Sequence, residues 1–521
     1  MARRKKLLLV WPRMGAATNE FDRLSHFLNK RAAFLPVSLA TVAALTPREW
    51  DVRIVDENVQ RIDYDEPVDL VGVSGLITQG LHGLRIAREF TRRGVPVVWG
   101  GPAVSLAPER FRDHADVLIL GEAERVWPRF LEDFLRGKHE REYRETERID
   151  LSSPPMPDYS SIPRDVVDQY FGGIVQCSRG CPYDCEFCSV PRFGGRRMRY
   201  KPIPAIMREI EQLHRMGLTT ILLADDNLTA KRSYARDLLR EIRDWNRKQK
   251  VPASFATQVS IDIAEDETLL ELAAEAGLTR LVIGIETPNP DSLEETNKRQ
   301  NLEADLLANI RRIHEHGIIV RSVCMVGFDH DDLSIFRQQR DFIMQAGIPA
   351  VQVFPLQAVD GSKLKDRIIA EGRYVDIMDA IQEDPEHADA SNTFTMIPKN
   401  MSIDQLRQGM AWLRWQLYDT EPFLHRLRTF FENYERSPKK GRLRIPARPV
   451  DLQMAWRVGR YILSEASRAD RKALRTMLGF ARRSSHPQRY MMAITNFLAL
   501  LHFQARERRE HPDPAAIPYP T

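Results

Sequence analysis

Short apolar runs alternate with longer helical segments over residues 1 to about 135. Most of these runs lack the alternation of apolar and polar positions that marks a strand with one exposed face. The runs are Leu7–Trp11, Val52–Val55, Leu70–Val73, Val95–Trp99 and Val117–Leu120. Continuous apolar runs are typical of parallel strands that helices cover on both faces. The pattern therefore predicts an α/β domain with a doubly wound parallel sheet.

Small and polar residues follow several of these predicted strands. In open α/β sheets, ligands bind beyond the carboxyl ends of the strands, where small residues let a ligand approach the backbone. No GxGxxG motif follows the first strand, which argues against a dinucleotide. The candidate ligand contacts in these turns are Ser74, Gly75, Leu76, Thr78, Gly100, Gly101, Pro102, Gly121 and Glu122.

From Gly173 to residue 356 the pattern changes to six strand and helix units. The expected strands are Ile174–Gln176, Thr220–Ala224, Ser254–Val259, Leu281–Ile285, Ile318–Val326 and Ala350–Phe354. Helices are expected over 203–216 and 265–276, each ending at a glycine, and another over 229–246. Six units are too few to close an eight-stranded barrel. We therefore expect a partial (β/α)6 barrel of the TIM type.

The remaining segments set the expected domain boundaries. The Pro/Ser-rich stretch Leu151–Asp158 reads as a linker, and residues 357–521 have helical periodicity. We expect an N-terminal Rossmann-like domain over 1–136, a linker over 137–170, the partial barrel over 171–356, and a mostly helical domain over 357–521.

Composition narrows the class of protein. Hydrophobic residues make up 43% and charged residues 28%, which are ordinary values for a globular cytoplasmic enzyme. The 76 basic and 72 acidic residues nearly balance, so no nucleic-acid groove is indicated. The apolar stretch Met491–Phe503, flanked by Arg489 and Arg506, is shorter than the roughly 20 residues of a membrane span. It predicts a buried core helix or, as an alternative, a weak contact with a membrane surface.

Three cysteines in one short loop carry the most specific chemistry. Cys181, Cys185 and Cys188 have CxxxCxxC spacing. Deprotonated cysteine sulfurs hold the irons of iron–sulfur clusters, and a cubane usually takes four. A loop that offers three leaves one iron free for a substrate or cofactor. The two other cysteines, Cys177 at the end of an apolar run and Cys324 inside a strand, are expected in the core.

Two alternatives for this loop remain open. A structural zinc site would usually need four ligands in paired sets, and the nearest downstream histidine, His214, lies on an expected helix. A disulfide framework is a poor match for five cysteines in 521 residues.

The CxxxCxxC spacing, with Phe187 just before the last cysteine, closely resembles the signature of the radical S-adenosylmethionine (SAM) superfamily. In that family SAM chelates the open iron. The segments Leu223–Asn227, Gly284–Asn289 and Val326–Asp329 resemble core motifs of its cobalamin-dependent branch. The segments Asp51–Asn58, Gly100–Pro102 and Leu120–Glu124 resemble its cobalamin-binding domain. Residues from about 357 resemble the C-terminal domain of a subgroup that includes hopanoid C-2 methylases.

The resemblance implies a 4Fe-4S cluster on Cys181, Cys185 and Cys188, with SAM and cobalamin beside it. The SAM contacts that it implies are Phe187, Asp225, Asp226, Asn227, Gln258, Ser260 and Glu286. The cobalamin contacts that it implies are the residues of the turns after the predicted N-terminal strands, from Ser74 to Glu122. Many cobalamin proteins supply a histidine from a DxHxxG motif, but His26 does not stand in such a motif. Cobalamin is therefore expected without a histidine ligand on cobalt.

The implied reaction begins with SAM cleavage to a radical that abstracts hydrogen from an unactivated carbon. Methylcobalamin then supplies a methyl group. We therefore expect a C-methyltransferase that acts on a small, hydrophobic or polycyclic substrate and receives electrons from a donor such as flavodoxin or ferredoxin. No acid–base residue is assigned, because the cofactors carry the chemistry. The alternatives are oxidative cyclisation or rearrangement without methyl transfer, and an iron–sulfur carrier without catalysis.

Overall fold

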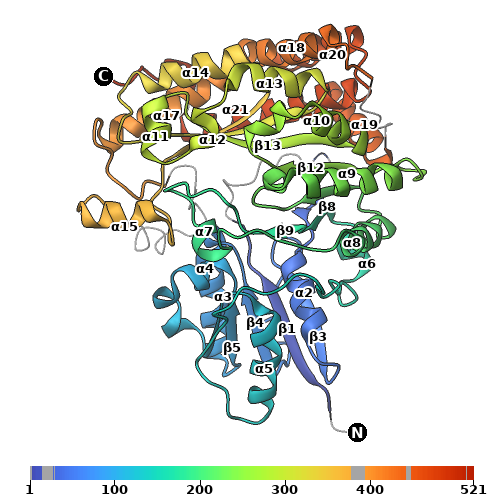
Figure 1. Cartoon of the computed structure of the whole chain (residues 1–521), viewed down its shortest axis with the longest axis vertical. Helices are drawn as coiled ribbons and strands as arrows, with labels where there is room; N and C mark the ends of the chain where they lie inside the picture. The colour runs from blue at the N-terminus through green and yellow to red at the C-terminus, as the bar shows by residue number, and fades with distance from the viewer. Residues whose placement is uncertain (1–2, 15–26, 28–29, 377–392, 442–447, 512) are drawn as a thin grey trace.

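The computed structural model describes residues 3–14, 27, 30–376, 393–441, 448–511 and 513–521. Two parallel sheets form two lobes (Figure 1). The N-terminal sheet makes the narrow lower lobe, and the second sheet with the C-terminal helices makes the broad upper lobe. His26, which does not stand in a DxHxxG motif, lies outside the described residues.

The lower lobe has a six-stranded sheet in the order β3-β1-β4-β5-β6-β7, in which all pairs are parallel. Its strands are β1 (Lys5–Trp11), β3 (Trp50–Asp56), β4 (Leu70–Ser74), β5 (Val97–Gly100), β6 (Val117–Leu120) and β7 (Glu142–Arg144). The five predicted strands are confirmed with small shifts of their ends. The sixth, β7, was not predicted because it has three residues and only Tyr143 is buried.

Helices on both faces of this sheet explain its continuous apolar runs. Along β1, Leu7 and Leu9 enter one core with α2 and α5, while Leu8 and Val10 enter another core with α3 and α4. These helices are α2 (Val37–Leu45), α3 (Gly80–Arg92), α4 (Pro102–Leu106) and α5 (Ala123–Leu135). Both faces of the strand are therefore buried, and the doubly wound prediction is confirmed.

The upper lobe contains a parallel sheet in the order β15-β14-β13-β12-β11-β8-β2. Its strands are β2 (Ala32–Phe34), β8 (Tyr170–Val175), β11 (Thr220–Leu223), β12 (Ser254–Gln258), β13 (Leu278–Glu286), β14 (Ile319–Val326) and β15 (Ala350–Pro355). All six predicted strands of the partial barrel are present. The seventh, β2, comes from the N-terminal part of the chain and pairs Ala32 with Tyr170 and Phe34 with Gly172.

The predicted barrel helices form where apolar residues recur at helical spacing. Helix α8 (Ile203–Arg215) buries Ile206, Ile210 and Leu213. Helix α10 (Glu267–Ala276) ends at Gly277, which has a φ of 94° that favours glycine. The other helices of this region are α6 (Arg164–Val167), α7 (Val190–Phe193), α9 (Arg232–Asn246), α11 (Pro290–Glu295), α12 (Arg299–Leu302), α13 (Leu306–Glu315) and α14 (Ile335–Ala346). Two short strands, β9 (Ser178–Arg179) and β10 (Arg199–Tyr200), pair antiparallel on either side of the segment 180–198.

The C-terminal region is helical, as predicted, and packs on the outer helices of the barrel (Figure 1). Its helices are α15 (Lys363–Ala370), α17 (Ile403–Tyr418), α18 (Thr420–Arg436), α19 (Pro449–Ser464), α20 (Arg468–Arg483) and α21 (Arg489–Glu510). Helix α17 contacts α14, and α18 contacts α13. The buried guanidinium of Arg426 on α18 donates to the carbonyl oxygens of Ile348 and Pro349 at 2.7 and 3.3 Å.

Most of the apolar stretch Met491–Phe503 lies inside α21 with its side chains buried. This stretch is therefore a core helix, and the alternative of a membrane contact through it is wrong. Among the described residues, no helix combines the length and the apolar character that a membrane span requires.

The close contact between α14 and α17 depends on a glycine, Gly409. A Cβ on Gly409 would lie 2.2 Å from the Phe336 ring. We expect Gly409→Ala to destabilise the protein by about 1–3 kcal/mol, because the packed helices would have to separate.

A matched control exists in α19, where a Cβ on Gly459 would meet no atom within 4 Å. Gly459→Ala should stabilise by roughly 0.5–1 kcal/mol through helix propensity alone. Urea unfolding followed by circular dichroism measures the change in the free energy of unfolding of each variant. Equal changes for the two variants would contradict the packing argument.

Candidate functional site

A cavity of about 400 Å³ lies where the turns at the carboxyl ends of the lower sheet face the upper sheet. From the lower lobe, Ser74, Leu76, Gly100, Gly101, Pro102, Gly121 and Glu122 line it. From the upper lobe, Ile174, Gln176, Arg179, Lys201, Ala224 and Asp226 line it. Seven of the nine predicted cobalamin contacts therefore meet in one cavity. Gly75 and Thr78 belong to the same turn as Leu76 but are not among its lining residues.

Glycines let the turns approach the cavity closely. Gly101 has a φ of 96°, and a Cβ there would lie 2.7 Å from the Ser74 hydroxyl oxygen. Gly121 has a φ of 89°, and a Cβ there would lie 2.9 Å from the Glu145 carbonyl oxygen. Both positions therefore require glycine.

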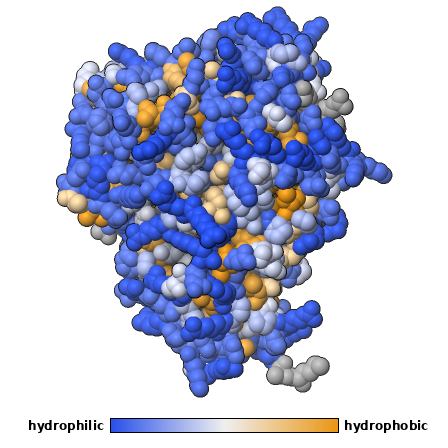
Figure 2. Space-filling view, viewed as in Figure 1, coloured by the Kyte–Doolittle hydropathy of each residue, from blue (hydrophilic) through white to orange (hydrophobic). Residues whose placement is uncertain are grey.

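Part of the cavity wall is apolar. Leu9, Trp11, Val42 and Trp127 contribute apolar side chains to its walls. Figure 2 shows apolar residues gathered on this face where the narrow lobe meets the broad one. None of the described residues that line the cavity is a histidine.

The buried carboxylate of Glu122 joins the two lobes. Its oxygens accept hydrogen bonds from Arg179 at 3.0 Å and from Arg199 at 2.7 and 2.8 Å. Burial alone would raise the pKa of Glu122, but the contacts with Arg199, the Ile149 amide and Arg179 hold it below its usual value. Both of its oxygens are engaged by arginines, so Glu122 lines the cavity mainly as part of an ion pair between the lobes.

The three cysteines lie in the loop that follows β8 and β9. In the described part of the chain, they do not form a group whose ligand atoms all lie within 4.8 Å of one another. Sulfurs around one zinc ion, at about 2.3 Å from the metal, would lie only about 3.8 Å apart. The three thiols are therefore not arranged as one zinc ion would require.

Lys298 lies beside the cysteine loop. Its Nζ is 2.8 Å from a carboxylate oxygen of Glu286 and 5.7 Å from the centre of the Phe187 ring. Burial raises the pKa of the Cys181 thiol, and it raises the pKa of Cys188 to about 11. The positive charge of Lys298 lowers the pKa of both thiols and so partly offsets burial. Metal binding would require these thiols to lose their protons, and Lys298 favours that change.

Lys298 and Gln300 were not predicted. Gln300 Nε2 is 3.7 Å from Cys185 Sγ. Both residues lie near the start of the short helix α12, and no motif marks them in the sequence. The polar run Asn297–Gln300, which follows α11, was the only signal.

Glu286, a predicted SAM contact, ends β13 with a φ of 64°. Residues other than glycine rarely adopt this conformation, and such strain concentrates at functional sites. The Gln339 side chain donates to the Glu286 carbonyl oxygen at 2.8 Å and fixes the backbone there. The carboxylate of Glu286 is directed to Lys298. Glu286 and the cysteine loop therefore share Lys298 as a polar neighbour.

The predicted Asp225–Asn227 group holds the base of the cysteine loop. Asp225 accepts hydrogen bonds from the amide and the hydroxyl of Ser178, and burial raises its pKa to about 6. Asp226 accepts from the Gly180 amide at 3.1 Å and also lines the cavity. Asp226 therefore stands at the boundary between the cavity and the cysteine loop.

The remaining predicted SAM contacts lie at neighbouring strand ends. Asn227 donates to the Ser260 hydroxyl at 2.7 Å. Gln258 is exposed at the end of β12. Phe187 packs against a small apolar cluster that includes Phe328 and Leu364.

The other two cysteines are buried, as expected. Cys177 and Cys324 have no measurable exposure. Burial and the neighbouring Asp225 raise the pKa of Cys177 well above its usual value.

A second cluster of potential metal ligands consists of Glu267, Glu271 and His316. The positive charge beside it is the ammonium group of Lys439. Lys439 Nζ lies 2.6 Å from Glu267 and 2.8 Å from Glu271. This cluster is an ion-pair network between α10 and the C-terminal region.

Three family models match the chain. The radical SAM superfamily matches residues 175–342, the B12 binding domain matches 32–131, and a domain of unknown function (DUF4070) matches 362–511. Their order agrees with the order that the motifs predicted.

Several curated proteins are similar over most of their length. Hopanoid C-2 methylase of Rhodopseudomonas palustris is 32% identical over 431 residues, which are 81% of this chain and 78% of that protein. An uncharacterized methyltransferase of Synechocystis is 29% identical over 462 residues, 87% of this chain and 84% of that protein. Bacteriochlorophyllide d C-12(1)-methyltransferase of Chlorobaculum tepidum is 26% identical over 376 residues, 70% and 79% of the two chains.

Two solved structures share the fold. OxsB, with aqua-cobalamin and SAM bound, has a TM-score of 0.60 at 14% identity over 98% of this chain and 80% of that chain. TsrM of Kitasatospora setae, with cobalamin and a [4Fe-4S] cluster bound, has a TM-score of 0.58 at 16% identity over 93% and 100%. With its cysteine loop, its cavity and these relatives, the chain belongs to the cobalamin-dependent radical SAM enzymes, in the subgroup that includes hopanoid C-2 methylase.

Proposed function

We propose that this enzyme transfers a methyl group to an unactivated carbon of a small hydrophobic substrate. The observation that carries the proposal is the position of Asp226. One of its carboxylate oxygens accepts from the Gly180 amide, next to Cys181, and the same residue lines the cavity. The cysteine loop and the candidate cobalamin cavity are therefore neighbours, as a reaction that uses both cofactors requires.

The residues that would hold the cofactors follow from this geometry. Cys181, Cys185 and Cys188 would hold the cluster, and the turns that line the cavity would hold cobalamin. When bound, the cluster, SAM and cobalamin would supply the electron, the hydrogen-abstracting radical and the methyl group. Lys298 would offset the negative charge of the thiolates, and the apolar part of the cavity wall would face the bound cofactor.

The SAM contacts are proposed from their place at the strand ends. Glu286, Ser260 and Gln258 offer acceptors near the loop, and Phe187 offers an apolar surface. Asp225 also holds the loop, because its Oδ1 accepts from both the amide and the hydroxyl of Ser178.

Methyl transfer is favoured over oxidative cyclisation or rearrangement by the relatives that match most of the chain. Hopanoid C-2 methylase and the bacteriochlorophyllide methyltransferase are both named for methyl transfer. The hydrophobic substrate is inferred from the likeness to hopanoid C-2 methylase. An iron–sulfur carrier would not need a second lobe with its own cofactor cavity.

The setting of the reaction is also part of the proposal. Cluster-binding thiols persist in a reducing compartment, and the described cysteines form no disulfide. We place the enzyme in the cytoplasm, where flavodoxin or ferredoxin would deliver electrons.

A membrane contact is proposed for α19 in place of the buried segment on α21. Leu452, Trp456 and Leu463 recur on one face of α19 and are 65%, 61% and 84% exposed. Arg460 lies over the Trp456 ring at 5.1 Å. Residues 448–490 contain ten basic and three acidic side chains. A helix with an apolar face and basic neighbours is suited to an anionic bilayer surface.

The cluster ligands can be tested by single substitutions. Replacing Cys181, Cys185 or Cys188 by Ala should abolish formation of 5′-deoxyadenosine after anaerobic reconstitution, because each removes one of three ligands. Cys177→Ala and Cys324→Ala are the matched controls and should keep cleavage, since both thiols are buried in the core. Cleavage that survives all three loop substitutions would show that the cluster assignment is wrong.

The reaction type can be tested with SAM that carries a deuterated methyl group. The enzyme, with methylcobalamin, is incubated with an extract of a strain that lacks the gene. We expect both S-adenosylhomocysteine and a deuterated product by mass spectrometry. Deoxyadenosine without either of them would indicate cyclisation or rearrangement instead.

The α19 surface can be tested with vesicles that contain phosphatidylserine. The wild type should sediment with them, and Trp456→Ser with Leu463→Ser should bind at least about tenfold more weakly, since each lost apolar contact costs about 1.5–3 kcal/mol. Leu135→Ser, at an exposed position on the lower lobe, is the control and should bind like the wild type. Absence of wild-type binding, or self-association that the double variant abolishes, would contradict the proposal.

A further inference from the structure

The first helix of the C-terminal domain contacts the cysteine loop. Helix α15 lies about 180 residues from the loop in sequence, and Glu186 stands between Cys185 and Phe187 at the point of contact. The Leu364 amide donates to the Glu186 carbonyl oxygen at 2.9 Å. The contact therefore reaches the backbone between two residues assigned to the cluster and SAM.

Arg367 holds the side chain of Glu186. Its Nε donates to one carboxylate oxygen at 2.7 Å, and its Nη2 donates to the other at 2.9 Å. Two parallel charge-assisted hydrogen bonds fix direction as well as distance. The contact with Glu186 raises the pKa of the Arg367 guanidinium more than any other contact does.

The barrel holds the loop from a second side. The Glu186 amide donates to the Thr296 carbonyl oxygen at 3.0 Å, and Asn297 donates to the Asp184 carbonyl oxygen at 3.2 Å. Lys363 of α15 adds an ion pair to Asp184 at 2.6 Å. The loop is therefore held between α15 and the segment after α11.

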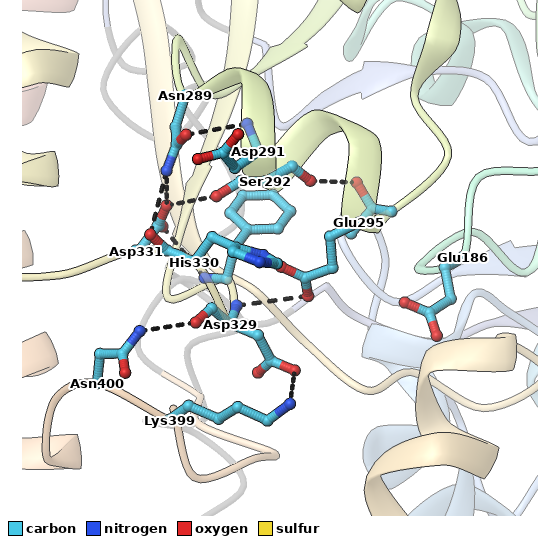
Figure 3. A network of polar contacts seen from close by, with 12 residues as sticks. Glu186, Asn289, Asp291, Ser292, Glu295, Asp329, His330, Asp331, Lys399 and Asn400 are labelled. Atoms are coloured by element: carbon cyan, nitrogen blue, oxygen red, sulfur yellow. Dashed lines mark hydrogen bonds and ion pairs between the residues drawn. The ribbon is translucent and has the colours of Figure 1, made fainter.

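Arg367 is itself fixed by carboxylates of the barrel. Its Nη1 lies 2.6 Å from Asp329, and its Nη2 lies 3.2 Å from Glu295. Figure 3 shows the carboxylates of Glu186, Glu295 and Asp329 around one common region. Asp329 also pairs with Lys399, at 2.9 Å, and with Arg373.

Apolar packing supports the same contact. Phe187 packs against a cluster that contains Leu364 and Ile368 of α15 together with Phe328. Because Phe187 directly precedes Cys188, this packing fixes the loop next to a second ligand.

We propose that Arg367 is a positioning residue through which the C-terminal domain locks the cysteine loop in its cluster-binding shape. The inference rests on the proposed assignment of Cys181, Cys185 and Cys188 as ligands. A cluster with three protein ligands depends on the surrounding contacts to keep those ligands in place. The domain of unknown function thereby becomes part of the cluster site.

The test measures cluster retention without substrate. The full-length protein and its Arg367→Gln variant are reconstituted anaerobically, and iron release to a chelator is followed by absorbance. We expect release at least about tenfold faster from Arg367→Gln, the lower end of the losses seen when supporting residues around metal ligands are removed. Glu186→Gln should give a similar increase, and the double variant should add little to either.

Arg373→Gln is the matched control. Arg373 also binds Asp329 and Glu371, as Arg367 does, but it does not contact Glu186. It should release iron at close to the wild-type rate. Arg367→Lys, which keeps the charge but loses the paired hydrogen bonds, should be intermediate and provides a milder variant if Arg367→Gln folds poorly.

The electron paramagnetic resonance spectrum of the reduced cluster gives a second readout. We expect the Arg367→Gln spectrum to broaden in the absence of SAM, because the loop samples more than one shape, while that of Arg373→Gln stays unchanged. Wild-type iron release in Arg367→Gln, or equal acceleration in Arg373→Gln, would overturn the proposal. Because no methyl transfer is measured, failure of the proposed reaction would leave this result unaffected.

Discussion

The ion pairs of Glu122 with Arg179 and Arg199 are the interaction on which the site depends. Glu122 follows a strand of the lower sheet, and Arg179 stands two residues before Cys181. The pairs therefore join the lobes, define one wall of the cavity and anchor the start of the cysteine loop. Breaking a buried ion pair by removing one partner costs about 3–5 kcal/mol, because the other charge remains buried. In this enzyme such a loss would also weaken the contact between the two lobes that border the cavity.

The cysteine loop itself has little regular structure, and its shape comes from residues around it. Asp225 and Asp226 hold its base, Thr296 and Asn297 hold one side, and α15 holds the other. Three separate parts of the chain thus converge on residues 178–188.

The strands and helices were largely predictable, because apolar runs such as Val117–Leu120 are buried on both faces and glycines such as Gly277 end helices. The sequence did not reveal β2, whose three residues become a strand only by pairing with β8. The cysteines were predicted from their spacing, and the glycine-rich turns from their place after the predicted strands. Arg367 and Lys298 were not predicted, since each acquires its role from a contact with the cysteine loop, which is distant in sequence. Glu122 was assigned to a ligand, but the structure engages its carboxylate with arginines, which no local pattern encodes.

The central claim is that one chain binds an iron–sulfur cluster and cobalamin in neighbouring sites that meet at Asp226. The most direct test is pulsed electron paramagnetic resonance on the enzyme loaded with cob(II)alamin and the reduced cluster. A magnetic interaction between the two paramagnetic centres, lost when Cys185 is replaced by Ala, is the result that this account predicts. Two independent spectra, or cobalamin that fails to bind the chain, would contradict it.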